Sequence, residues 1–138
     1  MQTHDQWHPG HLRELTDQEC RELLRAQRTG RVAWCDADGP VVLPVNYRFE
    51  DEGVVFRTSP HSELARHFSP GSAAFQIDHF DDHSQSGWSV LVRGRAERLG
   101  WDDLPDPDTS AKPWADGTRN VHVRIEAERI TGRRVLPS

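Results

Sequence analysis

The feature that most restricts the fold of this chain is a series of alternating segments joined by very short connections. After residue 30, apolar and polar residues alternate with a period of two, which is typical of β-strands. The pattern predicts strands over 31–36, 41–49 and 54–58, with Gly-containing turns at 37–39 and 51–53. Parallel strands need a crossover of about a dozen residues or more, so these strands are expected to be antiparallel, which argues against a Rossmann fold.

One helix is expected before these strands and another after them. Thr16 and Glu19 have the spacing of a capping box, and the helix that they start is expected to end at Thr29–Gly30. Ser59–Pro60 is a typical helix start, because Ser caps the free N–H groups and Pro suits the first turn. This second helix is expected to stop at Pro70–Gly71.

Alternation returns in the second half of the chain. Strands are predicted over 73–80, 87–99 and 121–127, followed by a bend at 131–132 and a closing segment at 135–136. Six antiparallel strands can avoid open edges by curling into a barrel. The predicted fold is therefore mostly β with short helices: a six-stranded antiparallel barrel formed by a single domain over 15–138, after a flexible N-terminal segment over 1–14.

Composition narrows the possible partners and the location. The chain has 138 residues and a net charge of −5. Nucleic-acid binding is not expected, because it needs positive charge to neutralise the phosphates. It contains no apolar run of the roughly 18 residues needed to cross a bilayer, so no membrane partner is expected. Cys20 and Cys35 lack metal-type spacing and are interpreted as reduced thiols. A cytoplasmic location is the default expectation.

A short segment at the end of the third strand has the donors that a phosphate needs. Arg57, Thr58, Ser59, His61 and Ser62 lie within six residues, where a strand runs into a predicted helix start. Cations, hydroxyls and free N–H groups at a helix start together favour an anion. The alternative is that Ser59 only caps the helix and that Arg57 is an ordinary surface residue.

The second strand carries an internal proline, in the segment Pro44–Val45–Asn46–Tyr47. Proline inside a strand is tolerated at an edge or a bulge, where backbone groups are free of the ladder. Such groups could bind the polar edge of a flat ring, with Asn46 as the side-chain partner. The alternative is a simple edge proline without a ligand.

The acidic loop after the fourth strand is a candidate metal site. His79 and Asp81 share a face of the strand, and His83 follows in the loop. The four-residue spacing of the two histidines suits a helix rather than a strand, so a solvated acidic loop is the preferred interpretation and no metal is expected.

A set of short segments, taken in chain order, carries a family resemblance. They are Gly30–Arg31–Val32–Ala33, Pro44–Val45–Asn46–Tyr47, Arg57–Thr58–Ser59 with Ser62 and Leu64, Ala74–Phe75–Gln76–Ile77–Asp78, the stretch 87–96, Pro113–Trp114 and the stretch 129–134. Together they resemble the pyridoxamine 5′-phosphate oxidase-like FMN-binding split barrels. The most similar branch is the one with nitroimidazole-resistance flavoproteins and deazaflavin-dependent relatives. The resemblance covers about Leu15 to Val135.

This resemblance implies a homodimer with two FMN sites at the subunit interface. It implies that Val45, Asn46 and Tyr47 lie along the isoalloxazine ring and that Arg57, Thr58 and Ser62 hold the phosphate. Trp88 and Ser89 would reach the flavin from the same or the partner subunit. One position departs from the family: many relatives have Lys where this chain has Glu63, a carboxylate that is unfavourable beside a phosphate. Either Glu63 turns outward, with Arg66 or His67 compensating, or the phosphate site is weak.

The activity implied is that of an FMN-dependent oxidoreductase that passes hydride or electrons through the flavin to a small organic substrate. The cofactor would carry the chemistry, so no side chain is named as catalytic. Two alternatives remain: a non-enzymatic protein that binds, stores or senses flavin or haem, and a deazaflavin-dependent reductase. The acidic tail of a deazaflavin needs several cations beyond Arg57, and the chain has one lysine, Lys112.

Overall fold

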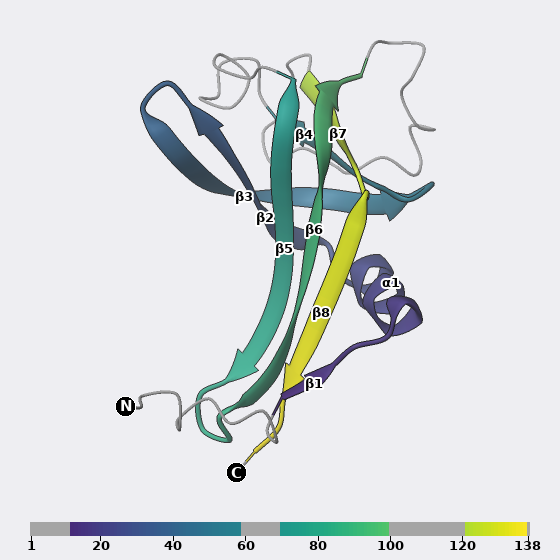
Figure 1. Cartoon of the computed structure of the whole chain (residues 1–138), viewed down its shortest axis with the longest axis vertical. Coiled ribbons are helices and arrows are strands. Elements are labelled where there is room, and N and C mark those ends of the chain that lie inside the picture. Colours follow the sequence, from purple (N-terminus) through teal and green to yellow (C-terminus); the bar gives the residue numbers. More distant parts are fainter. Residues whose placement is uncertain (1–11, 59–69, 100–120, 138) are drawn as a thin grey trace.

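The computed structural model describes residues 12–58, 70–99 and 121–137. These residues form one helix and eight strands that all pair antiparallel (Figure 1). In chain order the elements are β1 (Leu12–Glu14), α1 (Asp17–Ala26), β2 (Thr29–Asp36), β3 (Gly39–Glu50), β4 (Gly53–Thr58), β5 (Gly71–Asp81), β6 (Ser86–Arg98), β7 (Val121–Glu126) and β8 (Arg129–Val135). Strands over 31–36, 41–49, 54–58, 73–80, 87–99 and 121–127 were predicted, and each is present with ends shifted by one or two residues.

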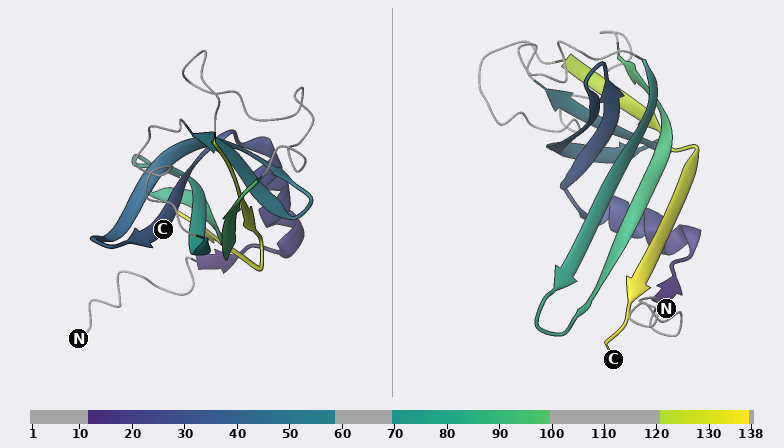
Figure 2. Two further views of the ribbon diagram at one scale, coloured as in Figure 1. Left: turned by 90° about the horizontal axis from the view of Figure 1, so that it is seen from above. Right: turned by 60° about the vertical axis from the view of Figure 1, so that its left-hand side comes forward.

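Six of the strands close into a barrel because β6 has two partners on the same side. The sheet order β6–β5–β2–β3–β4–β7 returns to β6, where Ala96–Arg98 pair with β7. The other part of β6, Gly87–Arg93, pairs with β8 instead, and β1 is added at the outer edge of β8. The predicted six-stranded antiparallel barrel is confirmed, with two further strands outside the ring (Figure 2).

The change of partner along β6 takes place at Gly94. The backbone carbonyl of Glu126 lies where a side chain at this position would begin, so only glycine allows the two strands to approach. Glu128 N–H then donates to Arg93 O at 3.1 Å, which marks the break between β7 and β8 at residues 127–128. The chain therefore leaves β7 earlier than the bend expected at Thr131–Gly132.

That expected bend is wrong, because Thr131 and Gly132 lie inside β8. A Cβ at Gly132 would come within 2.6 Å of Cys20 Sγ and within 2.9 Å of Leu15 Cδ1. The glycine is present because α1 packs closely on the strand and leaves no room for a side chain. A glycine that serves packing and one that serves a turn look alike in a single sequence.

The flexible segment expected over 1–14 includes residues that are ordered as a strand. Leu12–Glu14 form β1, paired with Arg133–Val135, and Leu15 N–H donates to Gly132 O at 3.0 Å. Three residues are too few for a recognisable period, and this strand forms only because β8 offers it an edge. Residues 1–11 lie outside the described ranges, as do the predicted second helix from Ser59 and the segment 100–117.

The helix α1 confirms the predicted capping box and covers part of the barrel. Glu19 N–H donates to Thr16 Oγ1 at 3.1 Å, and Thr16 N–H donates to Glu19 Oε1 at 2.9 Å. Cys20 and Leu24 are fully buried and belong to one hydrophobic core with the inward residues of the strands. The helix lies against β3, β6 and β8. In the described part of the chain no helix is long and apolar enough to span a membrane.

The strands have a second, outward side, which on β3, β2, β5 and β6 carries apolar residues among polar and charged ones. Val42, Ala33 and Ala74 are directly opposite one another on three neighbouring strands, and Leu91 and Phe80 lie on the same side of β6 and β5. Val42 is 58% exposed and Phe80 is 49% exposed. We call this surface, defined by Val42, Ala33, Ala74, Leu91 and Phe80, the outer face. The β2–β3 hairpin that carries Val42 extends away from the barrel (Figure 1, upper left).

Candidate cofactor site

The candidate site lies where β3 and β4 separate. The two strands pair from Glu50 and Gly53 at the turn as far as Tyr47 and Phe56. Beyond that pair β3 continues alongside β2 alone, and β4 continues alongside β7. Asn46 and Arg57 are the first residues on either side of the opening, so two of the predicted site residues come together there.

The edge of β3 at this opening has a defined set of backbone donors and acceptors. Tyr47 N–H donates to Arg28 O at 3.0 Å, toward the side of β2. Because backbone groups alternate along a strand, those of Asn46 and Pro44 face the opposite way, toward the opening. Pro44, which has no N–H, therefore loses no bond to β2. The exposed set is Pro44 C=O with Asn46 N–H, because the pairing of Tyr47 with Phe56 uses Asn46 C=O in the last bond to β4.

Of the two explanations for the internal proline, the edge is correct and the bulge is not. The register of β2 with β3 runs without interruption from Thr29 and Asn46 to Asp36 and Gly39. A bulge would place two residues opposite one, and no such position occurs along this pairing. Pro44 thus marks the stretch of β3 that β4 does not cover.

The side chains of Val45 and Tyr47 face the barrel interior. Both are buried, and the Tyr47 hydroxyl donates to Leu24 O at 2.6 Å. The Tyr47 ring makes an edge-to-face contact with Phe75, with ring centroids 4.6 Å apart. Burial raises the pKa of the Tyr47 phenol well above its usual value, so the hydroxyl stays protonated as a donor to the helix. What these two positions offer to a ligand is the strand backbone, not the side chains.

Arg57 presents a buried donor for which the described residues supply no acceptor. Its Nε atom is buried and has no hydrogen-bond partner in the described part of the chain, and the residue as a whole is half-buried opposite His122 on β7. Burial lowers the pKa of the guanidinium because it penalises the charged form. A guanidinium nevertheless stays charged in proteins, so an anion beside it would be favourable. Thr58, the next residue, is half-buried and has interactions of its own.

The remaining predicted site residues do not join this group within one chain. Trp88 is buried in the core, while Ser89 lies on the same outward side as Asn46. Two strands, β2 and β5, separate β3 from β6, so Ser89 is about 14 Å from Asn46 at the usual strand spacing. Ser59, Ser62 and Glu63 lie outside the described residues.

Sequence reasoning missed one polar neighbour of the site, Thr29. Its hydroxyl donates to Asn46 Oδ1 at 3.2 Å, and the two residues are directly opposite in the β2–β3 register. Thr29 was predicted only as the end of the helix. Counting outward from the turn between Asp36 and Gly39 would have placed it opposite Asn46, so the signal was the register of the hairpin.

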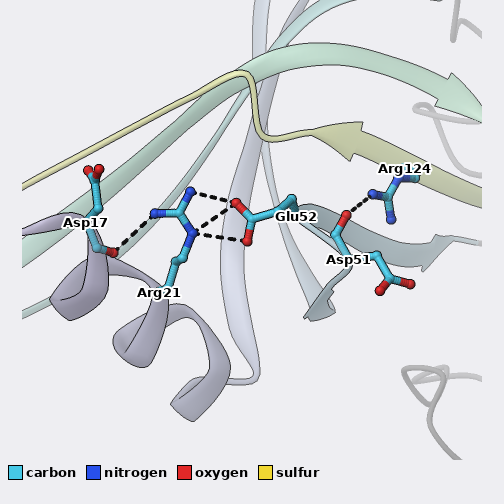
Figure 3. A network of polar contacts seen from close by, with 5 residues as sticks. All are labelled: Asp17, Arg21, Asp51, Glu52 and Arg124. Atoms are coloured by element: carbon cyan, nitrogen blue, oxygen red, sulfur yellow. Dashed lines mark hydrogen bonds and ion pairs between the residues drawn. The ribbon is translucent and has the colours of Figure 1, made fainter.

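The opposite end of the β3–β4 hairpin is held by a network of polar contacts (Figure 3). Asp51 and Glu52 form the turn with φ values of 52° and 58°. The Glu52 carboxylate accepts from Arg21 Nε and Nη2 on α1, the latter at 2.6 Å. Arg124 on β7 donates to Glu50 O at 3.2 Å and to Asp51 O at 2.5 Å. The turn is thereby tied both to the helix and to the barrel wall.

The acidic loop after β5 has a structural explanation in its own hydrogen bonds. Asp81 Oδ1 accepts from the backbone N–H groups of His83 at 2.9 Å and Ser84 at 3.4 Å. This is the usual way in which an aspartate stabilises a turn. Over the described ranges no group of three or more potential metal ligands is found.

Comparison with known proteins places this geometry in a family. A family model described as pyridoxamine 5′-phosphate oxidase matches residues 16–134. A Mycobacterium tuberculosis protein of uncharacterised function, Rv0080, is 29% identical over 134 residues, covering 89% of this chain and 85% of that protein. A solved structure from Corynebacterium glutamicum, provisionally described as a pyridoxamine 5′-phosphate oxidase, is 29% identical with a TM-score of 0.77 and covers 92% of this chain and 95% of that one.

An FAD-binding protein from Mycobacterium smegmatis is a further structural neighbour. It is 28% identical with a TM-score of 0.66, covering 89% of this chain and 97% of that chain. The family match extends from the capping box of α1 to the end of β8, and it therefore includes the barrel and the opening between β3 and β4. The chain belongs to the pyridoxamine 5′-phosphate oxidase family of split barrels.

Proposed function

We propose that this protein is an FMN-binding flavoprotein that holds its cofactor at the opening between β3 and β4 and acts as an oxidoreductase on a small organic substrate. The observation that carries the proposal is the buried Arg57 Nε, which has no acceptor among the described residues. Leaving such a donor unsatisfied costs about 1–3 kcal/mol or more. A ligand phosphate at this position would remove that cost.

The phosphate end of the cofactor fits the chemistry at the end of β4. Arg57 supplies the charge and Thr58 the adjacent hydroxyl, both half-buried at the end of the strand. A guanidinium can form two parallel hydrogen bonds to phosphate oxygens, and charge-assisted bonds of this kind are the strong ones. Ser59 and Ser62 follow in the sequence and would add hydroxyl donors.

The ring end of the cofactor fits the open edge of β3. The pyrimidine edge of a flavin carries an imide N–H between two carbonyl oxygens, so it needs one acceptor flanked by donors. The Pro44 C=O can accept from the imide, and the Asn46 N–H can donate to a neighbouring ring carbonyl, as their alternation along β3 allows. Pro44 also denies this edge the regular donor row that an added strand would use.

The residues of the site serve to bind and orient rather than to exchange protons. The Asn46 amide does not titrate, and the Arg57 guanidinium stays charged at any physiological pH. When bound, a flavin accepts and passes on hydride at its N5 position, which is chemistry that the protein does not need to supply. No catalytic side chain is therefore assigned.

A second copy of this chain is the proposed partner, and it would cover the outer face. Val42 and Phe80 are large apolar residues left exposed on one side of the sheet, and Ala33, Ala74 and Leu91 lie on the same side. Large apolar residues left exposed on one face favour an interaction surface there. Asn46 and Ser89 lie on this same side, too far apart to share one ring within a chain. A two-fold contact would bring Ser89 of the partner subunit toward the opening.

The test is the absorption spectrum of the purified protein, followed by titration of the stripped protein with FMN, FAD and haem. Bands of oxidised flavin, with FMN binding more tightly than FAD, are the expected result. A colourless protein that binds neither flavin would overturn the proposal, and a Soret band would assign haem instead. Turnover of a nitroaromatic or quinone with a nicotinamide donor separates an enzyme from a protein that only binds flavin. Light scattering should show a dimer that Val42→Asp converts to a monomer.

A further inference from the structure

Thr29 and Asn46 form a side-chain pair at the border of the site. The Thr29 hydroxyl donates to Asn46 Oδ1 at 3.2 Å, and the pair is directly opposite in the β2–β3 register. Asn46 is the first residue of β3 that is not paired with β4, whereas Thr29 lies on the strand at the other side, β2. The hydrogen bond therefore crosses from the wall of the barrel to the residue that faces the ligand position.

This bond determines which end of the Asn46 amide is available. A carboxamide has one acceptor oxygen and one nitrogen with two donor hydrogens, attached to the same planar carbon. With Oδ1 directed to Thr29 on the β2 side, Nδ2 projects away from β2, toward the opening. In the described part of the chain no residue accepts a hydrogen bond from Nδ2. The donor end is left for a ligand.

We infer that Thr29 is a positioning residue that holds the Asn46 amide with its N–H groups toward an acceptor atom of the flavin ring. The inference rests on the proposed flavin site and adds a residue to it that neither binds the ring nor belongs to the predicted set. Without the hydroxyl, the amide can rotate by half a turn and present its oxygen to an electron-rich ring atom. The donor would be lost and replaced by a repulsive contact.

Two neighbouring groups do not compete for this role. Arg31, the next outward residue on β2, forms an ion pair with Asp78 at 3.2 Å and is thereby directed toward β5. Tyr47 directs its hydroxyl into the barrel, to Leu24 O. Among the described residues, Thr29 is the one whose hydroxyl donates a hydrogen bond to the Asn46 side chain.

The test is FMN titration of the full-length protein and its Thr29→Val variant, which keeps the β-branched shape and removes the hydroxyl. FMN affinity should fall about tenfold and the flavin absorption maximum should shift. Both are expected because the flavin ring loses the hydrogen bond from the Asn46 amide. Thr29→Ser should restore the affinity and the spectrum. Gln18→Ala, which removes a polar side chain at an exposed position on α1, should alter neither.

A double-mutant cycle shows whether Thr29 acts through Asn46. Thr29→Val combined with Asn46→Ala should bind FMN as weakly as Asn46→Ala alone, since the second change has nothing left to position. If the losses of the two single variants add up in the double variant, the inference is overturned. It is also overturned if Thr29→Val binds FMN like the wild type. Neither result would contradict the proposed flavin site. A wild-type protein that fails to bind FMN would overturn the site and the inference together.

Discussion

The two ends of the β3–β4 hairpin use arginines in opposite ways. At the turn, Arg124 donates hydrogen bonds to the carbonyl oxygens of Glu50 and Asp51 and to the carboxylate of Glu126. At the other end, five residues along β4 from the turn, Arg57 keeps a buried Nε without a hydrogen-bond partner among the described residues. Both arginines are half-buried on the barrel wall, so burial alone does not explain the difference.

The difference separates a structural end from a functional end. A cation whose donors are all satisfied within the chain lowers the free energy of the folded state. A cation left with a buried, unpaired donor raises it unless something outside the chain supplies the acceptor. The same two strands thus carry a stabilised turn and an unsatisfied opening, and variants at the two ends should affect different measurements.

The largest expected effect comes from Arg57→Ala. Loss of the guanidinium should weaken FMN binding by about 1.5–3 kcal/mol, the range for a hydrogen bond to a charged group. The free energy of unfolding without ligand should stay level or rise, because a desolvated charge is removed. Fluorescence titration and urea unfolding measure the two quantities. Unchanged affinity would mean that the phosphate lies elsewhere, and a clear loss of apo stability would make Arg57 a structural residue like Arg124.

Arg124→Ala should give the reverse result. We expect a loss of about 2 kcal/mol in unfolding free energy, since carbonyl oxygens at the turn lose a charged donor. FMN affinity measured below the unfolding transition should change less than threefold. Arg95→Ala, at an exposed arginine of β6, is the matched control and should stay within about 0.5 kcal/mol of the wild type. If the two variants unfold alike, the network in Figure 3 does not stabilise the turn.

Tyr47→Phe tests the position at which the paired part of the hairpin ends. The hydroxyl donates to Leu24 O within the core, so its removal should cost about 1 kcal/mol of stability. FMN affinity should remain that of the wild type, because the side chain faces away from the opening. A large loss of affinity with intact stability would show that the Tyr47 side chain lies along the ring after all.

The smallest expected effect is the pH dependence of the Glu52–Arg21 pair. The bond to Arg21 lowers the pKa of Glu52, so its contribution to stability is complete above the carboxyl pKa of the unfolded chain and is lost as the pH falls through the lowered folded-state value. For this exposed pair we expect about 0.5 kcal/mol. Glu52→Gln and Arg21→Gln should each flatten the acid side of the stability curve by that amount. A curve identical to that of the wild type would assign no net energy to the pair.

Much of the fold could be predicted because it depends on local patterns. The capping box of Thr16 and Glu19, the period of two along six strands and the short turns all arise from neighbours in the chain. The bend predicted at Thr131–Gly132 was wrong for the opposite reason. Gly132 is needed because Cys20 and Leu15, more than a hundred residues earlier in the chain, pack against it. The strand Leu12–Glu14 likewise forms because it pairs with the edge of β8, which is far away in the sequence.

For the site, the sequence by itself determined which residues could bind a flavin: a proline-bearing strand with Asn46 and a strand end with Arg57. Only the tertiary structure decided how they are used. It turned Val45 and Tyr47 into the core, separated β3 from β4 beyond the Tyr47–Phe56 pair, left Arg57 Nε buried without a partner among the described residues and set Thr29 opposite Asn46. The physical reason is that side-chain periodicity is a local property, whereas burial and hydrogen-bond satisfaction depend on which strands become neighbours when the barrel closes.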